Sequence, residues 1–414
     1  KYVLTVPTWE GGTVVVSGGF STLVGQVRRN FAQLTVDGSN VVGGSFAPGL
    51  LSPGAVARVL PVAGGQIVVA GNFDFANASA RSHVVRLNAD GSIDPAFNSG
   101  GAGPNGPVTD LVQLADGRLV LTGTFTTYNG ETFGNVVQLL ANGARDPSWQ
   151  PGTRVLGGAR RVYVQPGGGL LLLGDVFNPS TSDQRTALAG LTAQGIIDPL
   201  FRTGIGPAGG TVAAVAIQRD GRILVGGSFT AYAAYSGAVG QPYLVRLLPT
   251  GEIDTTFAVR VDGPVSAMAL QPDGRVLVSG DFRLLNDTGC AYLARLTVDG
   301  RFESAFIPDF QLSGLPSFIA PLPDGSFMLG GAFTAALGGG SANFLVRVGP
   351  TGAIDSTFAA PGLSAPPTDT AALEDGSLLM VGDLQLGNRL RVGIVKGLSA
   401  NGPQLIQEPD GGTI

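Results

Sequence analysis

Residues 218–229 read QRDGRILVGGSF, and close variants of this phrase recur along the chain. An Asp-Gly pair lies near its start, a short apolar run follows, and a glycine pair leads to a phenylalanine. Asp-Gly is a preferred pair in tight hairpin turns, because glycine readily adopts the positive φ that these turns need. Variants of the phrase end at Phe125, Phe282 and Phe333. The phrase therefore predicts a β-hairpin that is repeated along the chain.

The phenylalanine that ends the phrase, called here the marker phenylalanine, returns at a nearly constant interval. It stands at positions 20, 73, 125, 177, 229, 282 and 333, and Leu384 takes the eighth place, so the intervals are 51 to 53 residues. A fixed period of this length is the signature of a repeat architecture. We expect eight repeats that form one domain over residues 1–407, with an exit linker or tail at 408–414.

Each repeat is expected to consist of strands. In the fifth repeat, residues 212–218 alternate apolar and small side chains, and residues 223–229 form the return strand after the Asp-Gly turn. The glycine pair in the return strand marks a β-bulge or a close approach of two backbones. A variable loop at 230–241 precedes a third strand at 243–248, and a fourth short segment at 252–257 reads EIDTTF.

This pattern favours one fold over its competitors. A small four-stranded sheet cannot bury both of its faces by itself, whereas sheets stacked around an axis bury one another. We therefore expect an all-β chain, a β-propeller of about eight four-stranded blades. Seven blades with a displaced terminal unit is the alternative, because the sequence does not show how a ring closes. A β-solenoid fits less well, since its coils are usually shorter and lack internal Asp-Gly hairpins.

The repeat resembles the bacterial delta-60 repeat, a β-propeller repeat of large secreted and surface proteins. The resemblance is strongest over residues 218–229 with 244–257 and over 271–282 with 293–306. It implies a bacterial protein that is secreted or held at the cell surface, of the kind that in Bacteroidota often ends in a type IX secretion sorting domain. No such domain is recognisable here. The family has no agreed catalytic residues, so the resemblance assigns none.

Composition argues against several classes of function. Charged residues make up 13% of the chain and the net charge is −5 with no basic stripe, which argues against binding to nucleic acid or to anionic membranes. No apolar run approaches the ~20 residues of a membrane span. The single cysteine, Cys290, allows no internal disulfide, and the single histidine, His83, does not support a His-rich metal site or a Ser-His-Asp triad.

Charged side chains recur at two equivalent positions. The fourth segments carry an acid, at Asp94, Asp146, Asp198, Asp254, Glu303 and Asp355. An Asp followed by Pro, Ser or Thr is typical of an Asx turn. The third strands carry Arg86, Arg246, Arg295 and Arg347, with Gln33, Gln138 and Lys396 in the equivalent places. We expect each arginine to pair with the acid of its own repeat, as Arg246 with Asp254. A ring of cations that lines a channel is the alternative.

The Asp-Gly turns also suggest a calcium site. Residues 88–94 read NADGSID and alternate side chains that bear oxygen. Ca²⁺ takes six to eight oxygen ligands, however, and the distant bidentate Glu of the usual calcium loop is missing. A plain hairpin turn explains the residues equally well. We therefore expect no metal and no cofactor, with calcium as the alternative.

Binding residues are expected where the repeats differ from one another. The residue before the marker phenylalanine varies, and if this position faces the central axis, it offers polar contacts at Asn72, Asp281 and Asp383. The loop at 230–241 is the longest of its kind and, with its flank, carries Tyr232, Tyr235 and Tyr243. Tyrosines on a Gly/Ala-rich loop give rigid, amphipathic contact area at low entropic cost. Packing beneath the loop is the alternative role for these tyrosines.

These observations predict a non-enzymatic, exported β-propeller. It would serve as a structural or protein-interaction module on the bacterial surface or in an extracellular assembly, with a protein partner or with copies of itself, because weakly charged surfaces associate readily. The alternative is a glycan-binding or glycan-cleaving propeller, a hydrolase or lyase, that uses its axial face. Aromatic residues make up only 7% of the chain, which offers less stacking surface than sugar-cleaving clefts usually have.

Overall fold

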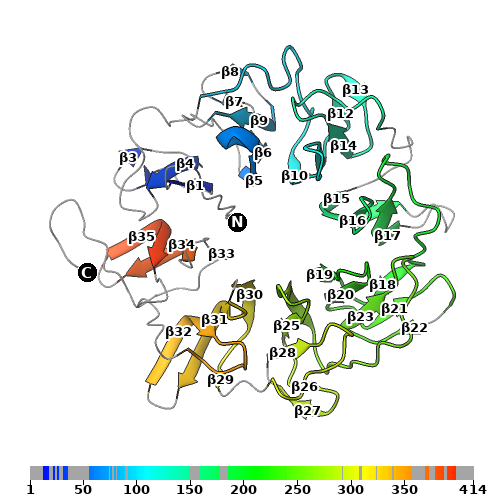
Figure 1. Ribbon diagram of the computed structural model, residues 1–414, viewed down its shortest axis with the longest axis vertical. Coiled ribbons are helices and arrows are strands. Elements are labelled where there is room, and N and C mark those ends of the chain that lie inside the picture. Colours follow the sequence, from blue (N-terminus) through cyan, green and yellow to red (C-terminus); the bar gives the residue numbers. More distant parts are fainter. Residues whose placement is uncertain are drawn as a thin grey trace. The chain divides into compact units, whose positions relative to one another are not determined.

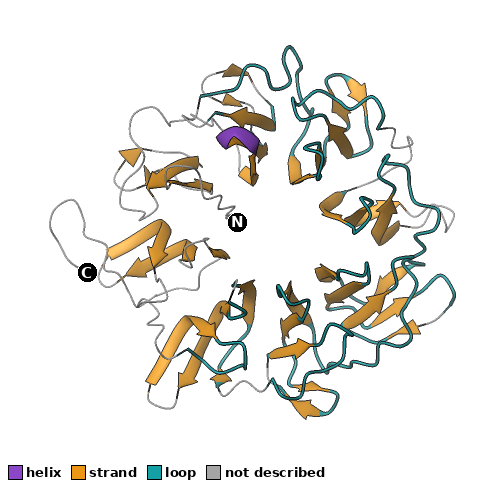
Figure 2. Ribbon diagram, viewed as in Figure 1, coloured by secondary structure: helices purple, strands orange, loops and turns teal. Residues whose placement is uncertain are grey.

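The computed structural model describes most of residues 56–149, 158–177, 185–306 and 310–355, together with strands within 13–35 and 369–397. Strands and turns make up nearly all of it, and the helix η1 (Ala63–Gly65) is a single 3-10 turn (Figure 2). The predicted all-β class is confirmed. No helix in these described stretches is long and apolar enough to cross a bilayer.

The chain divides into two compact units, and the boundary lies between Phe201 and Arg202. Each unit contains several of the repeats that the sequence predicts. A single domain over residues 1–407 stays a prediction. The predicted tail at 408–414 lies outside the described residues.

The fifth repeat shows how the phrase folds. Strands β19 (Val212–Ile217), β20 (Ile223–Gly227) and β23 (Leu244–Leu247) form an antiparallel sheet in the order β19-β20-β23. Gly221 in the turn has a φ of +84°. The Asp220 carboxylate accepts a 3.0 Å hydrogen bond from the backbone N–H two residues later. The three strands and the Asp-Gly hairpin are therefore as predicted.

The same sheet recurs in the neighbouring repeats. In the first unit the sheets are β5 (Val56–Val62), β6 (Gln66–Gly71) and β9 (Val84–Leu87); β10 (Val108–Gln113), β11 (Leu119–Gly123) and β14 (Val136–Leu139); and β15 (Ala159–Val164), β16 (Leu170–Phe177) and β17 (Arg185–Leu191). In the second unit they are β24 (Val265–Leu270), β25 (Val276–Gly280) and β28 (Leu293–Leu296); β30 (Pro316–Pro321), β31 (Phe327–Leu337) and β32 (Gly340–Val348), with β29 (Gln311–Leu312) beside β31; and β33 (Asp369–Ala372), β34 (Leu378–Leu386) and β35 (Arg389–Gly397). Near the N-terminus, β1 (Thr13–Ser17) pairs with β4 (Phe31–Thr35) and β2 (Thr22–Leu23) with β3 (Gln26–Val27).

The fourth segment of a repeat is a short edge element. In the fifth repeat Ile253 forms an isolated antiparallel bridge with Leu247, and the chain then turns. Equivalent bridges lie at Ile93, Arg145, Ile197, Phe302 and Ile354. In four of these repeats the Asp after the bridge accepts a hydrogen bond from the backbone N–H two residues later and so competes with a continued strand, at Asp94, Asp146, Asp198 and Asp254.

The loop predicted at 230–241 contains regular structure, which the sequence analysis missed. Strands β21 (Ala231–Ala233) and β22 (Val239–Gly240) form a hairpin, and β18 (Gly206–Ala208) adds a third strand. We call this β18-β21-β22 sheet the outer sheet. Equivalent two-stranded hairpins are β7 (Phe75–Ala76) with β8 (Ser79–Ala80), β12 (Thr127–Tyr128) with β13 (Glu131–Thr132), and β26 (Leu284–Leu285) with β27 (Thr288–Gly289).

The middle strand of each repeat carries the core. All of β20 is buried, and so is the marker phenylalanine Phe229. A bulge between Val212 and Ala214 faces the glycine pair, where a Cβ on Gly227 would lie 2.0 Å from the Thr211 carbonyl oxygen. The predicted bulge and close backbone approach are both confirmed.

Repeats within a unit pack against their neighbours. The first strands lie side by side, β5, β10 and β15 in the first unit and β19, β24 and β30 in the second (Figure 1). One apolar cluster joins Leu224 and Phe257 of the fifth repeat to Val278 and Phe282 of the sixth. Burial of such a side chain contributes about 1.5–3 kcal/mol. Stability therefore arises from contacts between adjacent repeats as well as within them.

Candidate functional site

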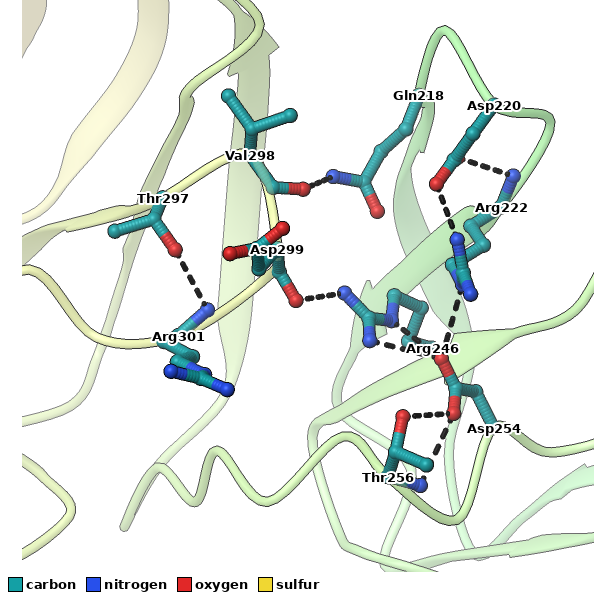
Figure 3. Close-up of polar contacts among 10 residues, drawn as sticks. All are labelled: Gln218, Asp220, Arg222, Arg246, Asp254, Thr256, Thr297, Val298, Asp299 and Arg301. Carbon is teal, nitrogen blue, oxygen red and sulfur yellow. Dashed lines mark hydrogen bonds and ion pairs between the residues drawn. The ribbon is translucent and has the colours of Figure 1, made fainter.

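Arg246 on β23 joins the fifth repeat to the sixth. Its Nε and Nη2 each lie 2.8 Å from Oδ2 of Asp254, and its Nη1 donates to the Asp299 carbonyl of the next repeat (Figure 3). The guanidinium also lies over the Phe257 ring, 5.0 Å from the centroid. Gln218 adds a second bond of the same kind, because its Nε2 donates to the Val298 carbonyl at 2.8 Å. Side chains of one repeat thus hold the turn of the next.

Asp254 forms the predicted Asx turn. Its Oδ1 accepts hydrogen bonds from the Thr256 N–H at 3.0 Å and from the Thr256 hydroxyl at 2.5 Å. Burial raises the pKa of Asp254, but these hydrogen bonds and the positive charge of Arg246 outweigh it, so the pKa lies below its ordinary value. Arg222, whose Nε lies 3.3 Å from Asp254, also pairs with Asp220. Asp254 is therefore an ionised structural group, unsuited to act as a general acid near neutral pH.

The same junction recurs in other repeats. Arg86 pairs with Asp94 and donates to the Ala141 carbonyl at 2.6 Å. Arg295 pairs with Glu303 at 2.8 Å and donates to the Pro350 carbonyl. The predicted pairing of the arginine with the acid of its own fourth segment is confirmed here, whereas Arg347 lies closer to the turn acid Asp324, at 2.6 Å, than to Asp355, at 3.4 Å. These four cations are tied into the scaffold and do not form a free cationic ring.

Among the repeats whose side chains the structure describes, the third and fourth depart from this pattern. In the third, the amide oxygen of Gln138 faces Arg118 and accepts from its Nε at 3.1 Å, while Arg118 Nη1 lies 3.1 Å from Asp146. In the fourth, Gly190 takes the place of the arginine, and a Cβ there would lie 2.5 Å from the Phe201 ring. Glycine is therefore required by the packing of that phenylalanine.

A cavity of about 750 Å³ lies beside the Arg246 junction, between the fifth and sixth repeats. Its lining includes Thr256, Val259, Asn286, Asp299, Arg301 and Phe302. Among the residues that the structure describes, no group of three or more His, Cys, Asp or Glu side chains is placed to hold a metal ion. The cavity can accept small polar groups, but its most buried charge, Arg246, is already bonded to Asp254.

The three predicted tyrosines differ in exposure. Tyr232 is fully buried and packs edge-on against Phe229, with ring centroids 5.9 Å apart, so it serves the packing role. Tyr243 is half-buried with a φ of +66° and packs against the core that the fifth and sixth repeats share. Tyr235 is 47% exposed, and the Arg202 guanidinium lies 5.1 Å from its ring centroid. Only Tyr235 of the three presents a largely exposed ring, and its binding role stays a prediction.

The outer sheet displays further apolar surface that the sequence analysis did not single out. Ile205, next to β18, is 53% exposed, and Val239 on β22 is 71% exposed. A Cβ on Gly204 would lie 2.4 Å from the Tyr235 backbone nitrogen, which places the Ile205 segment directly beside that tyrosine. In the sequence, these two exposed residues could have been noticed as apolar side chains, Ile205 and Val239, that stand among Gly and Ala residues. We call Arg202, Ile205, Tyr235 and Val239 the outer patch.

The predicted axial residues are solvent-facing where the structure describes them. Asn72 and Asp281 are both exposed. Asp383 lies in β34, opposite Val392 of β35, and its side chain is outside the described part of the chain. Their role in binding stays a prediction.

Five segments of the chain match a known family of repeats. Residues 65–97, 114–148, 218–257, 271–306 and 322–358 match the family described as "Domain of unknown function (DUF5122) beta-propeller". The chain is built from β-propeller repeats. Each matched segment extends from the first hairpin turn toward the aromatic end of the fourth segment. The comparison with curated proteins gave no match.

Solved structures of other propellers are similar to these repeats. The extracellular domain named for the hybrid two-component system BT3049 of B. thetaiotaomicron is 12% identical with a TM-score of 0.44, over 99% of this chain and 49% of that one. PorZ, a surface component of the type IX secretion system of Porphyromonas gingivalis, is 13% identical with a TM-score of 0.40, over 97% and 53%. The WD40 propeller of Doa1 is 10% identical with a TM-score of 0.43, over 84% and 98%. The chain spans about half the length of the first two.

Proposed function

We propose that the protein is a non-enzymatic, exported β-propeller that binds another protein chain through the outer patch of its fifth repeat. The observation that carries this proposal is the exposure of Val239 on the outer sheet and of Ile205 and Tyr235, which flank its strands β18 and β21. Tyr and Arg are enriched among the residues that dominate binding energy at protein interfaces. The outer patch combines both with aliphatic side chains.

The energetics of the outer patch favour a protein as the partner. Transfer of one exposed Ile, Val or Tyr side chain into an interface contributes about 1.5–3 kcal/mol. Tyr235 is held by the stacked Arg202, and its strand neighbour Tyr232 is anchored in the core. Side chains that are already ordered lose less entropy on binding. A glycan would leave most of this aliphatic surface uncovered.

The rest of the repeat supports a scaffold rather than a catalyst. Arg246, Asp254 and Gln218 are buried and bonded within the junction between repeats. The resemblance to the delta-60 repeat supports export, with which the low charge is compatible, and our proposal is that the protein acts at the bacterial surface or outside the cell. Cys290 is compatible with this location, because it is buried and burial raises its pKa to about 12, which keeps the thiol unreactive.

Photocrosslinking from a cysteine beside the outer patch tests the proposal. Ser236→Cys places a thiol next to Tyr235 on an exposed position, whereas the buried Cys290 resists labelling. A benzophenone maleimide on Ser236→Cys should crosslink to one discrete protein in source cells or their medium. Thr288→Cys, in the equivalent hairpin of the sixth repeat and also exposed, is the matched control.

The crosslink should depend on the outer patch itself. Adding Tyr235→Ser and Val239→Ser to Ser236→Cys should abolish the product, while the unfolding midpoint changes little because both side chains are exposed. Equal crosslinking from Ser236→Cys and Thr288→Cys, or a product that survives loss of both side chains, would overturn the proposed role of the outer patch.

A further inference from the structure

The first strand of the fourth repeat carries two adjacent arginines at a position where the other described repeats begin with Ala, Ser or Thr. In every repeat from the second to the seventh, this strand has a bulge that inserts one extra residue. In β15 the extra residue and its successor are Arg160 and Arg161. The equivalent pairs are Ala57-Arg58, Thr109-Asp110, Ala213-Ala214, Ser266-Ala267 and Ser317-Phe318. In repeat proteins, binding residues often lie where one repeat departs from the sequence pattern of the others. The Arg160-Arg161 pair is such a departure and is therefore a candidate binding site.

The bulge explains why both arginines reach solvent. In a regular strand successive side chains point to opposite faces, but a bulge re-aims one of them. Arg160 and Arg161 are accordingly both exposed. Further along β15, Tyr163 is half-buried and Val164 is 41% exposed. The strand thus presents two cations, a phenol and an aliphatic side chain.

The neighbouring strands leave this surface positive. Asp110 on β10 is 3% exposed; its Oδ1 pairs with Arg58 of β5 and accepts from the Leu111 N–H at 2.9 Å, and its Oδ2 accepts from the Val162 N–H at 2.9 Å. The Asp110 carboxylate is therefore bonded to Arg58 and to two backbone N–H groups, and no ion pair joins it to the described arginines of β15. Asp175, the acid on the adjoining strand, has an interaction of its own. Within the described residues, no acid pairs with Arg160 or Arg161.

Tyr163 lies between the exposed arginines and the exposed Val164 on β15. Tyr163 lies two residues after Arg161 on the same strand and is half-buried, and burial raises its pKa, so the hydroxyl stays protonated at neutral pH. Arg58 of β5 pairs with Asp110 of β10, and Asp110 accepts from the Val162 N–H of β15, so contacts link the three first strands. The cations on β5 and β15 therefore belong to one surface that spans neighbouring repeats of the first unit. We call Arg58, Arg160, Arg161, Tyr163 and Val164 the β15 surface.

We propose that the β15 surface binds an acidic peptide segment of another protein that contains aliphatic residues. Guanidinium groups bind carboxylates in a fork geometry, which suits Glu and Asp side chains. The exposed Val164 beside them suits an aliphatic peptide residue better than it suits a sugar acid. The chain as a whole carries a net charge of −5, so the local positive charge gives the peptide one preferred place to bind. This surface lies in a different repeat from the outer patch, and either can exist without the other.

Fluorescence anisotropy with a labelled peptide of repeating Glu-Glu-Val tests this proposal. Arg160→Gln with Arg161→Gln should weaken binding about tenfold and reduce its salt dependence, because two exposed ion pairs are lost. Arg219→Gln with Arg301→Gln removes the same charge from two exposed arginines of the second unit and should leave binding nearly unchanged. All four positions are exposed, so we expect both proteins to fold with unaltered melting temperatures.

Three other outcomes would overturn it. Equal weakening by the two double variants would mean that overall charge, not the β15 surface, attracts the peptide. Equally tight binding of a Lys-Lys-Val peptide would contradict selection for acid. Binding of polygalacturonate in place of the acidic peptide, with loss in Arg160→Gln/Arg161→Gln, would assign the surface to an anionic glycan instead.

Discussion

At the scale of the residue, Arg246 serves three partners at once. It pairs with Asp254, stacks on Phe257 and donates to the Asp299 carbonyl of the next repeat. The pairing with Asp254 could be predicted, because both residues recur at fixed positions of the repeat. The bond to the next repeat could not, since a backbone carbonyl acceptor leaves no trace in the side-chain sequence.

Replacement of Arg246 should be costly. Both Arg246 and Asp254 are about 95% buried, so Arg246→Met leaves Oδ2 of a buried carboxylate with only the weaker contact from Arg222, while Oδ1 keeps its bonds to Thr256. We expect a loss of roughly 3 kcal/mol in the free energy of unfolding. Urea unfolding followed by fluorescence would measure it. Arg295→Met, in the equivalent junction, should cost a similar amount, and the exposed Arg301→Met should cost almost nothing. Equal stability of all three variants would refute the role of the junction.

The acids of the Asx turns make stability depend on pH. Although burial raises their pKa, hydrogen bonds and arginine charges lower the net pKa of Asp94, Asp146 and Asp254 below the ordinary value of 3.8. A carboxyl group with a lowered pKa in the folded state contributes stability above its unfolded pKa and loses it as the pH falls through the folded pKa. Unfolding midpoints should therefore hold at mildly acidic pH and fall below about pH 4.

Substitution of Asp254 alone measures how much this one acid contributes to the pH dependence of stability. Asp254→Asn should be less stable than the native protein at neutral pH, and its midpoint should fall less steeply in acid. Asp273→Asn, which changes an exposed turn acid of the sixth repeat, serves as the control and should keep the native pH profile. If Asp254→Asn and the native chain lose stability in parallel below pH 4, Asp254 does not contribute in this way.

At the scale of the element, turns explain both what was predicted and what was missed. The Asp-Gly hairpins and the glycine-pair bulges follow from residues whose backbone preferences are strong. The hairpins after the marker phenylalanine were expected as loops, although Asn129 and Gly130 have φ values of +50° and +83° and form the kind of turn that Asn-Gly predicts. Their strands have only two or three residues, too few for an alternating pattern to show.

Alanine substitutions at two glycines, Gly143 and Gly130, separate the cost of backbone strain from the cost of overpacking. Gly143 has a φ of +80°, and a Cβ there would lie 2.8 Å from the Phe97 ring of the preceding repeat. Gly130 has nearly the same φ, with nothing within 4 Å of such a Cβ. Gly143→Ala should therefore destabilise the chain by roughly 1–3 kcal/mol more than Gly130→Ala, because it adds overpacking to the same strain. Thermal and urea unfolding would measure the difference. Equal losses would show that Phe97 does not require this glycine.

At the scale of the whole molecule, the fold could be predicted because the sequence repeats at a regular interval. Repeats of about 52 residues that cannot bury their own faces predict a propeller, and the family match agrees. The outer patch was foreseen only as a tyrosine-bearing loop, because whether Tyr232 or Tyr235 faces solvent depends on the short strands that the sequence does not reveal. The β15 surface was missed, since two adjacent arginines look unremarkable until the bulge exposes both.

Native mass spectrometry of the chain, isolated gently from its source, tests the central claim most directly. The native chain should appear above its own mass of 42.0 kDa, at a defined mass that includes a bound protein. The variant Tyr235→Ser/Val239→Ser should appear at 42.0 kDa with an unchanged fold. A native chain found only at 42.0 kDa, or a complex that persists in the variant, would contradict an interaction module that works through the outer patch.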